Sequence, residues 1–145
     1  MLKTRIIFTF IALFAFIFTY LHAIPPPSPP PPVNHAIALL KKIKGEVKFD
    51  QIVVKNQTKM IVNGIIKKGI DENTPENYFI SFSYFGAESN ETHSFAELNI
   101  PIKPPKAGPW NVTIPGVVDG IAYQTFYVLK DDKVLDSATI TKRDT

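Results

Sequence analysis

From Gly45 onward the chain is a series of short apolar runs separated by asparagine, glycine, proline and aspartate, and this spacing constrains the fold most. Short runs with turn residues between them are typical of the strands of an antiparallel sandwich. The pattern therefore predicts an all-β, immunoglobulin-like sandwich of about seven antiparallel strands. We expect these strands at Val47–Val54, Met60–Ile66, Tyr78–Phe85, Phe95–Ile102, Trp110–Ile114, Ala122–Leu129 and Val134–Thr141.

The breaks between the runs carry recognisable turn chemistry. Lys55–Thr58 and Lys130–Lys133 lie between apolar runs and predict hairpin loops, and Gly86–Thr92 predicts a longer polar loop. Pro104–Pro109 is expected to turn or to cross between sheets, because proline cannot donate to a strand ladder. The pattern of His35–Lys44 fits a short helix and a lead-in strand equally well.

The N-terminus is typical of a secretory signal peptide. Lys3 and Arg5 precede an apolar run, Ile6–Leu21, that is shorter than the roughly 20 residues a membrane-spanning helix needs. Ala23 supplies a small residue at the expected cleavage point, so residues 1–23 predict a signal and a secreted, extracellular protein. Because Leu21 stands where a small residue is usual, retention as a membrane anchor is the alternative.

Residues 24–34 form a proline-rich leader. Pro25–Pro32 contains a single serine, which fixes the backbone at almost every position and predicts a stiff polyproline II spacer. A ligand for a proline-recognising module, or a cell-wall tether, is the alternative interpretation. Residues 35–145 are then expected to form one β-sandwich domain.

Charge and cysteine content exclude several classes of function. The chain has 16 basic and 13 acidic residues, and loss of Lys3 and Arg5 leaves 14 against 13. Basic residues form no grouping larger than pairs such as Lys41–Lys42 and Lys67–Lys68, so no nucleic-acid partner is expected. The absence of cysteine removes disulfides, thiol catalysis and thiolate metal sites, so stability must come from apolar packing.

No catalytic or metal-binding grouping is visible in the sequence. His35 and His93 are far apart, whereas the copper–zinc site of the superoxide dismutases, which are also sandwiches, needs several clustered histidines. His93 follows a loop and is expected to be solvated, and Asp131–Asp132 fits a turn better than a calcium site. Since no Gly-x-Ser-x-Gly is present either, we expect no metal, no cofactor and no enzymatic activity.

Three Asn-x-Ser/Thr sequons predict a glycoprotein if the chain passes through a eukaryotic secretory pathway. Asn56 and Asn90 lie in predicted loops. Asn111 lies in a predicted strand, so its side chain must face solvent to accept a glycan.

Side-chain alternation predicts which residues face the core. In Tyr78–Phe85 the set with Tyr78, Ile80, Phe82 and Tyr84 is expected to point inward, and the set Phe79, Ser81, Ser83 and Phe85 outward. In Ala122–Leu129 neither face is clearly polar, which suits a central or a ligand-lined strand. The many aromatic residues fit a packed core or the lining of a ligand cavity.

Four stretches in order resemble the ML lipid-recognition family, in particular fungal proteins similar to phosphatidylglycerol/phosphatidylinositol transfer proteins. They are MIVNGIIKKGI (60–70), YFISFSYFG (78–86), IPIKPPKAGPWNVTIPGVV (100–118) and AYQTFYVLKDDKVLDSATI (122–140). Family members usually carry disulfide cysteines, one of them in the final strand where this chain has Asp136–Ala138.

The resemblance implies a non-enzymatic carrier that holds a lipid or sterol between two sheets. Burial of an acyl chain suffices for such binding, at about 0.8 kcal/mol per methylene. The alternative is a secreted immunoglobulin-like surface-binding or effector module with a solid core, and in either case we expect a monomer. The candidate lining of the lipid site is Ile80, Phe82, Tyr84, Trp110, Tyr123 and Tyr127.

Overall fold

The structure is a computed structural model that describes residues 11–13, 15 and 34–144. The chain divides into one unit of residues 1–31 and another of residues 32–145. The predicted signal peptide and proline-rich leader lie, apart from residues 11–13, 15 and 34, outside the described residues. Within the described part of the chain, no helix has the length and apolar content needed to span a membrane.

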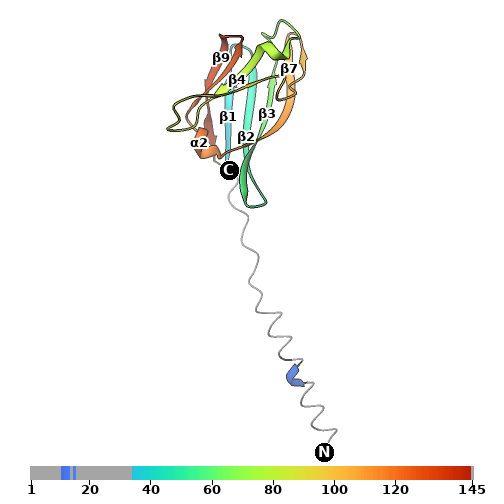
Figure 1. The fold of residues 1–145 in the computed structure, drawn as a ribbon, viewed down its shortest axis with the longest axis vertical. Coiled ribbons are helices and arrows are strands. Elements are labelled where there is room, and N and C mark those ends of the chain that lie inside the picture. The colour runs from blue at the N-terminus through green and yellow to red at the C-terminus, as the bar shows by residue number, and fades with distance from the viewer. Residues whose placement is uncertain (1–10, 14, 16–33, 145) are drawn as a thin grey trace, which may run out of the picture. The chain divides into compact units, whose positions relative to one another are not determined.

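Residues 34–144 fold into two antiparallel sheets stacked as a sandwich, which confirms the predicted all-β class (Figure 1). The six-stranded sheet has the order β10-β1-β2-β3-β7-β6, and the four-stranded sheet has the order β5-β4-β8-β9. The strands are β1 (His35–Leu40), β2 (Gly45–Val54), β3 (Gln57–Ile66), β4 (Tyr78–Phe82), β5 (Glu91–Ser94), β6 (Ile102–Lys103), β7 (Lys106–Pro115), β8 (Thr125–Lys130), β9 (Lys133–Thr139) and β10 (Thr141–Arg143). Two short helices, η1 (Pro75–Asn77) and α2 (Val118–Ile121), connect strands.

The predicted strand Phe95–Ile102 is wrong. Phe95 begins a turn after β5, in which the Ser94 amide donates to Glu97 and the Glu97 amide donates to the Ser94 hydroxyl, both at 3.0 Å. This reciprocal pair closes the turn and directs the fully buried Phe95 ring into the core. The apolar residues of this stretch have the spacing of a strand, but here they belong to a turn that packs against the core.

The remaining breaks are mostly where the sequence places them. Val54 pairs with Gln57 and Lys130 with Lys133, so both predicted hairpins are confirmed. His35–Lys44, which the sequence left open, begins with strand β1. Pro104–Pro109 does not cross between sheets, because the chain turns at residues 104–105 and Lys106 already begins β7 beside β6.

The predicted strand Val134–Thr141 is divided into β9 and β10. The chain changes sheets at the buried Ile140, so that β9 pairs with β8 while β10 pairs with β1. Together with the short strands β1, β5 and β6, this division gives ten strands in residues 34–144 rather than about seven.

Candidate functional site

The predicted lining residues do not all lie in one place. Ile80, Phe82 and Trp110 are buried between the sheets, and Tyr84 is half-buried and donates to the Pro115 carbonyl at 3.0 Å. Tyr123, however, is 70% exposed.

Tyr123 and Tyr127 were expected to line the space between the sheets, and this expectation is wrong. Phe126 and Val128 are fully buried, so they occupy the inward positions of β8. Tyr127 lies between them and must point to the opposite face, because successive side chains of a strand alternate. The sequence could not choose between the two faces of this strand, since both carry apolar residues.

The space between the sheets is filled by side chains. The ring of Phe49 in the six-stranded sheet lies 6.3 Å from that of Phe82 and 5.8 Å from that of Phe126, both in the four-stranded sheet. Met60 and Val62 beside them also have no accessible area. A void wide enough for an acyl chain would leave accessible area on its walls, so the centre of the sandwich is a packed core.

Trp110 is the one large core residue with an unmet polar group among the described residues. Its indole lies directly over Gly64, where a Cβ would come within 1.9 Å of the ring. The buried Trp110 Nε1 has no hydrogen-bond partner. A buried donor without an acceptor costs about 1–3 kcal/mol, so an acceptor brought here by a ligand would be favourable.

The outer side of the four-stranded sheet has an unusual composition, since its outward positions carry no charge. One row across the sheet pairs Ser94 with Phe79, Phe79 with Leu129 and Leu129 with Val134; the next pairs Thr92 with Ser81, Ser81 with Tyr127 and Tyr127 with Ser137. A third pair is Thr125 with Thr139. We call these residues the neutral face: Phe79, Ser81, Thr92, Ser94, Thr125, Tyr127, Leu129, Val134, Ser137 and Thr139.

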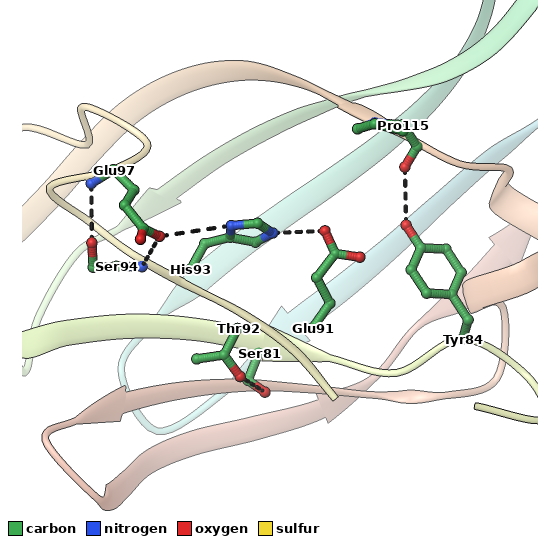
Figure 2. Close-up of polar contacts among 8 residues, drawn as sticks. All are labelled: Ser81, Tyr84, Glu91, Thr92, His93, Ser94, Glu97 and Pro115. Atoms are coloured by element: carbon green, nitrogen blue, oxygen red, sulfur yellow. Dashed lines mark hydrogen bonds and ion pairs between the residues drawn. The ribbon is translucent and has the colours of Figure 1, made fainter. Parts of the chain in front are cut away.

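A hollow of about 460 Å³ lies over part of the neutral face. Phe79 and Leu129 form its apolar floor, and Asp131 and Asp132 border one end. The hydroxyl groups of Ser81 and Thr92, 2.9 Å apart, border it as well. Figure 2 shows this hydroxyl pair on the opposite side of β5 from the side chains of His93 and Glu91.

The outer side of the six-stranded sheet differs sharply. It carries Glu46, Lys48 and Asp50 at alternate positions of β2, the usual pattern of a solvated surface. The sequon residue Asn111 pairs with Asn63 on this sheet and is exposed, as its use as a glycan acceptor requires.

The asparagines of the other two sequons are also exposed. Asn56 lies in the β2–β3 turn, and Asn90 ends the loop that precedes β5. Glycans at Asn56 and Asn111 would leave the neutral face uncovered, whereas a glycan at Asn90 would lie beside it, because Thr92 of the same sequon belongs to the neutral face.

On its inner side, β5 is held by a chain of polar contacts. His93 Nε2 lies 2.7 Å from Glu91, so the expectation that His93 is simply solvated is wrong (Figure 2). Burial, together with the nearby Glu91 carboxylate, raises the pKa of Tyr84 to about 12 and keeps its phenol protonated as a donor. Across residues 34–144 and the few described residues before them, no three metal-ligating side chains come together.

Phe79 and Ser81 belong to the set of β4 that the alternation placed outside, and both face the outer side, where Phe79 is half-buried and Ser81 is only 5% exposed. The sequence did contain one indication of the neutral face, because the outward set of this strand includes no charged residue. Comparison with protein-family models, with curated proteins and with solved structures found no match to this chain.

Proposed function

We propose that this protein is a secreted, non-enzymatic binding module that acts through its surface, and that the neutral face binds a neutral polysaccharide. The observation that carries the proposal is the combination of a packed interior with an uncharged outer sheet face that includes Phe79 and Tyr127. A solvated sheet face ordinarily carries polar and charged residues, as the outer side of β2 does with Glu46, Lys48 and Asp50.

The composition of the neutral face suits a sugar chain better than an apolar protein surface. Aromatic rings offer flat apolar area to the C–H faces of a pyranose. Six hydroxyl-bearing residues accompany the aromatic residues. Ser81 is only 5% exposed and is hydrogen-bonded to Thr92, and the Ser94 hydroxyl accepts the Glu97 amide, while the hydroxyls of Thr125, Ser137 and Thr139 can both donate and accept, as sugar hydroxyls require. The carboxylates of Asp131 and Asp132 at the end of the hollow add acceptors.

The shape of the neutral face also fits an extended ligand. Phe79 and Ser81 follow one another on the outer side of β4, at about 3.3 Å per residue along the strand. Phe85 lies in the turn after β4 and Tyr123 lies before β8, and their rings are 83% and 70% exposed. The hydroxyl and aromatic groups therefore run along the strands rather than around a closed pocket.

The proposal is tested by sedimenting the purified protein with insoluble chitin, cellulose and β-1,3-glucan. Tyr127→Ala should reduce the fraction bound to the preferred polysaccharide by about tenfold, a typical loss for one central contact residue. Ile61→Ala, on the outward side of β3, is the matched control and should bind as the unmodified protein does. Melting temperatures of both variants show that the fold is intact.

Two results would contradict this function. One is equal binding by Tyr127→Ala and Ile61→Ala, which would place the contact elsewhere. The other is a failure of the unmodified protein to bind any of the three neutral polysaccharides.

Lipid or sterol binding between the sheets is a second proposal, supported by the unpartnered Trp110 Nε1 and by the order of the ML-like stretches. In this second proposal the sheets separate and the ligand contacts Ile80, Phe82 and Trp110. Tyr84 would lie at the edge of that ligand site. Native mass spectrometry of protein extracted from expressing cells should then detect bound lipid. A consistently empty protein that also takes up no fluorescent fatty acid or sterol would exclude it.

A further inference from the structure

Two lysine pairs that are distant in the sequence lie side by side in the fold. The Lys67 amide donates to the Lys44 carbonyl at 3.3 Å, and the Lys68 amide donates to the Ile43 carbonyl at 3.1 Å. The turn after β1 and the segment after β3 are thereby joined at one end of the sandwich, the end away from the C-terminus in Figure 1.

A third basic segment adjoins them. The Ile70 amide donates to the Pro105 carbonyl at 3.2 Å, which brings the β6–β7 turn against residues 67–70. Ile43 and Ile70 are buried beneath the three segments and fix them to the core. The lysine cluster that results consists of Lys41, Lys42, Lys44, Lys67, Lys68, Lys103 and Lys106, all exposed.

Carboxylates lie near this cluster, since Asp71 and Glu72 follow Ile70 directly and Asp131 and Asp132 border a hollow with Gly69, but they do not pair with its lysines. Within residues 34–144, none of these seven lysines forms an ion pair with a carboxylate, and segments 41–44, 67–70 and 103–106 contain no acidic residue. The nearby Asp136 carboxylate accepts the backbone amides of Lys42 and Ile43, at 2.7 and 3.1 Å. Seven of the fourteen basic residues that follow residue 23 therefore lie at one end of a domain whose net charge is close to zero.

We propose that the lysine cluster binds an acidic polysaccharide, at a site separate from the neutral face. Lysines are compact charges on flexible stems and can follow irregularly spaced carboxylate or sulfate groups. Charge complementarity on this scale favours a polyanion, because each lysine that contacts it releases counterions.

The cluster lacks what the other polyanionic partners would use. Its three segments contain no aromatic residue on which a base could stack and no arginine for bidentate contacts to a base edge. Ile43 and Ile70 are buried, so the three segments themselves offer no large apolar side chain to enter a bilayer.

The test uses heparin and polygalacturonate as sulfated and carboxylated probes, with binding measured by calorimetry over a range of salt concentrations. The variant Lys42→Gln/Lys67→Gln/Lys106→Gln removes one charge from each segment of the cluster. At 0.1 M salt it should bind the preferred probe about a hundredfold more weakly and show a shallower salt dependence, because three counterion-releasing contacts are lost.

The matched control is Lys48→Gln/Lys55→Gln/Lys59→Gln, which makes the same change in net charge on β2, the β2–β3 turn and β3. It should change the affinity less than about threefold. Equal weakening by both triple variants would overturn the proposal, because the attraction would then come from net charge alone.

Two further measurements decide the ligand class and the independence of the site. Tighter binding of duplex DNA, or of phosphatidylserine vesicles, than of either acidic polysaccharide would also overturn the proposal. Tyr127→Ala should leave heparin affinity unchanged, so failure of the neutral-face proposal and failure of this one give different results.

Discussion

Gly64 is the position where a single methyl group should disturb the core most. Its missing side chain leaves room for the Trp110 indole, and a Cβ there would lie 1.9, 2.3 and 2.4 Å from three ring atoms. Ordinary carbon contacts are about 3.5–4.0 Å, so the indole would have to move by roughly 1.5 Å. Phe95, whose ring centroid is 6.3 Å from that of Trp110, limits this movement. We expect Gly64→Ala to cost about 3 kcal/mol, the upper part of the usual range for overpacking.

A double-mutant cycle with Trp110→Leu isolates this contact. Once the indole is gone, Gly64→Ala should be neutral or stabilising by about 0.5–1 kcal/mol, the usual advantage of alanine over glycine within a strand. The coupling energy from urea unfolding should therefore be about 3–4 kcal/mol, and Gly64→Ala alone should lower the melting temperature by roughly 10–20 °C. If Gly64→Ala costs the same free energy in both backgrounds, the indole does not rest on Gly64 and the packing argument fails.

Three further outcomes are expected. Phe49→Ala should cost about 3–5 kcal/mol in urea unfolding, because its ring joins the two sheets, whereas Val53→Ala, 48% exposed, should change little; similar costs would refute a packed centre. Hydrogen bonds from Tyr78 and Lys130 lower the pKa of Asp71 to about 2, so its stabilisation is present above its ordinary value of 3.8 and is lost as the pH falls through 2. The melting temperatures of the unmodified protein and Asp71→Asn should therefore differ at pH 5–7 and converge toward pH 2, and a gap that does not depend on pH would contradict this account. Expression in a eukaryotic secretory host, followed by mass measurement before and after enzymatic deglycosylation, should show one glycan fewer for each Asn→Gln variant, and an unmodified polypeptide mass would refute the sequon predictions at Asn56, Asn90 and Asn111.

The sequence predicted the inward set of β4 correctly because an apolar set and a more polar set alternate along this strand. Ile80 and Phe82 alternate with serines, and an alternation of apolar and polar residues has only one orientation that buries the apolar set. In β8, Phe126 and Tyr127 are neighbours of similar character, so the same rule gives two acceptable orientations. The tertiary structure selects the one in which Phe126 meets Phe49 and Phe82, and Tyr127 is left on the neutral face.

The neutral face and the lysine cluster are both formed by segments that are distant from one another in the sequence. The lysine cluster joins turns some 25 to 60 residues apart, and no local pattern reveals that they meet. The sequence by itself determined the all-β class, both hairpin turns and the inward set of β4, because strand periodicity and turn chemistry act between near neighbours. Only the tertiary structure decided which side of β8 faces the core, whether the space between the sheets is filled and where the lysines converge, because these depend on contacts between strands and turns that the chain order does not specify.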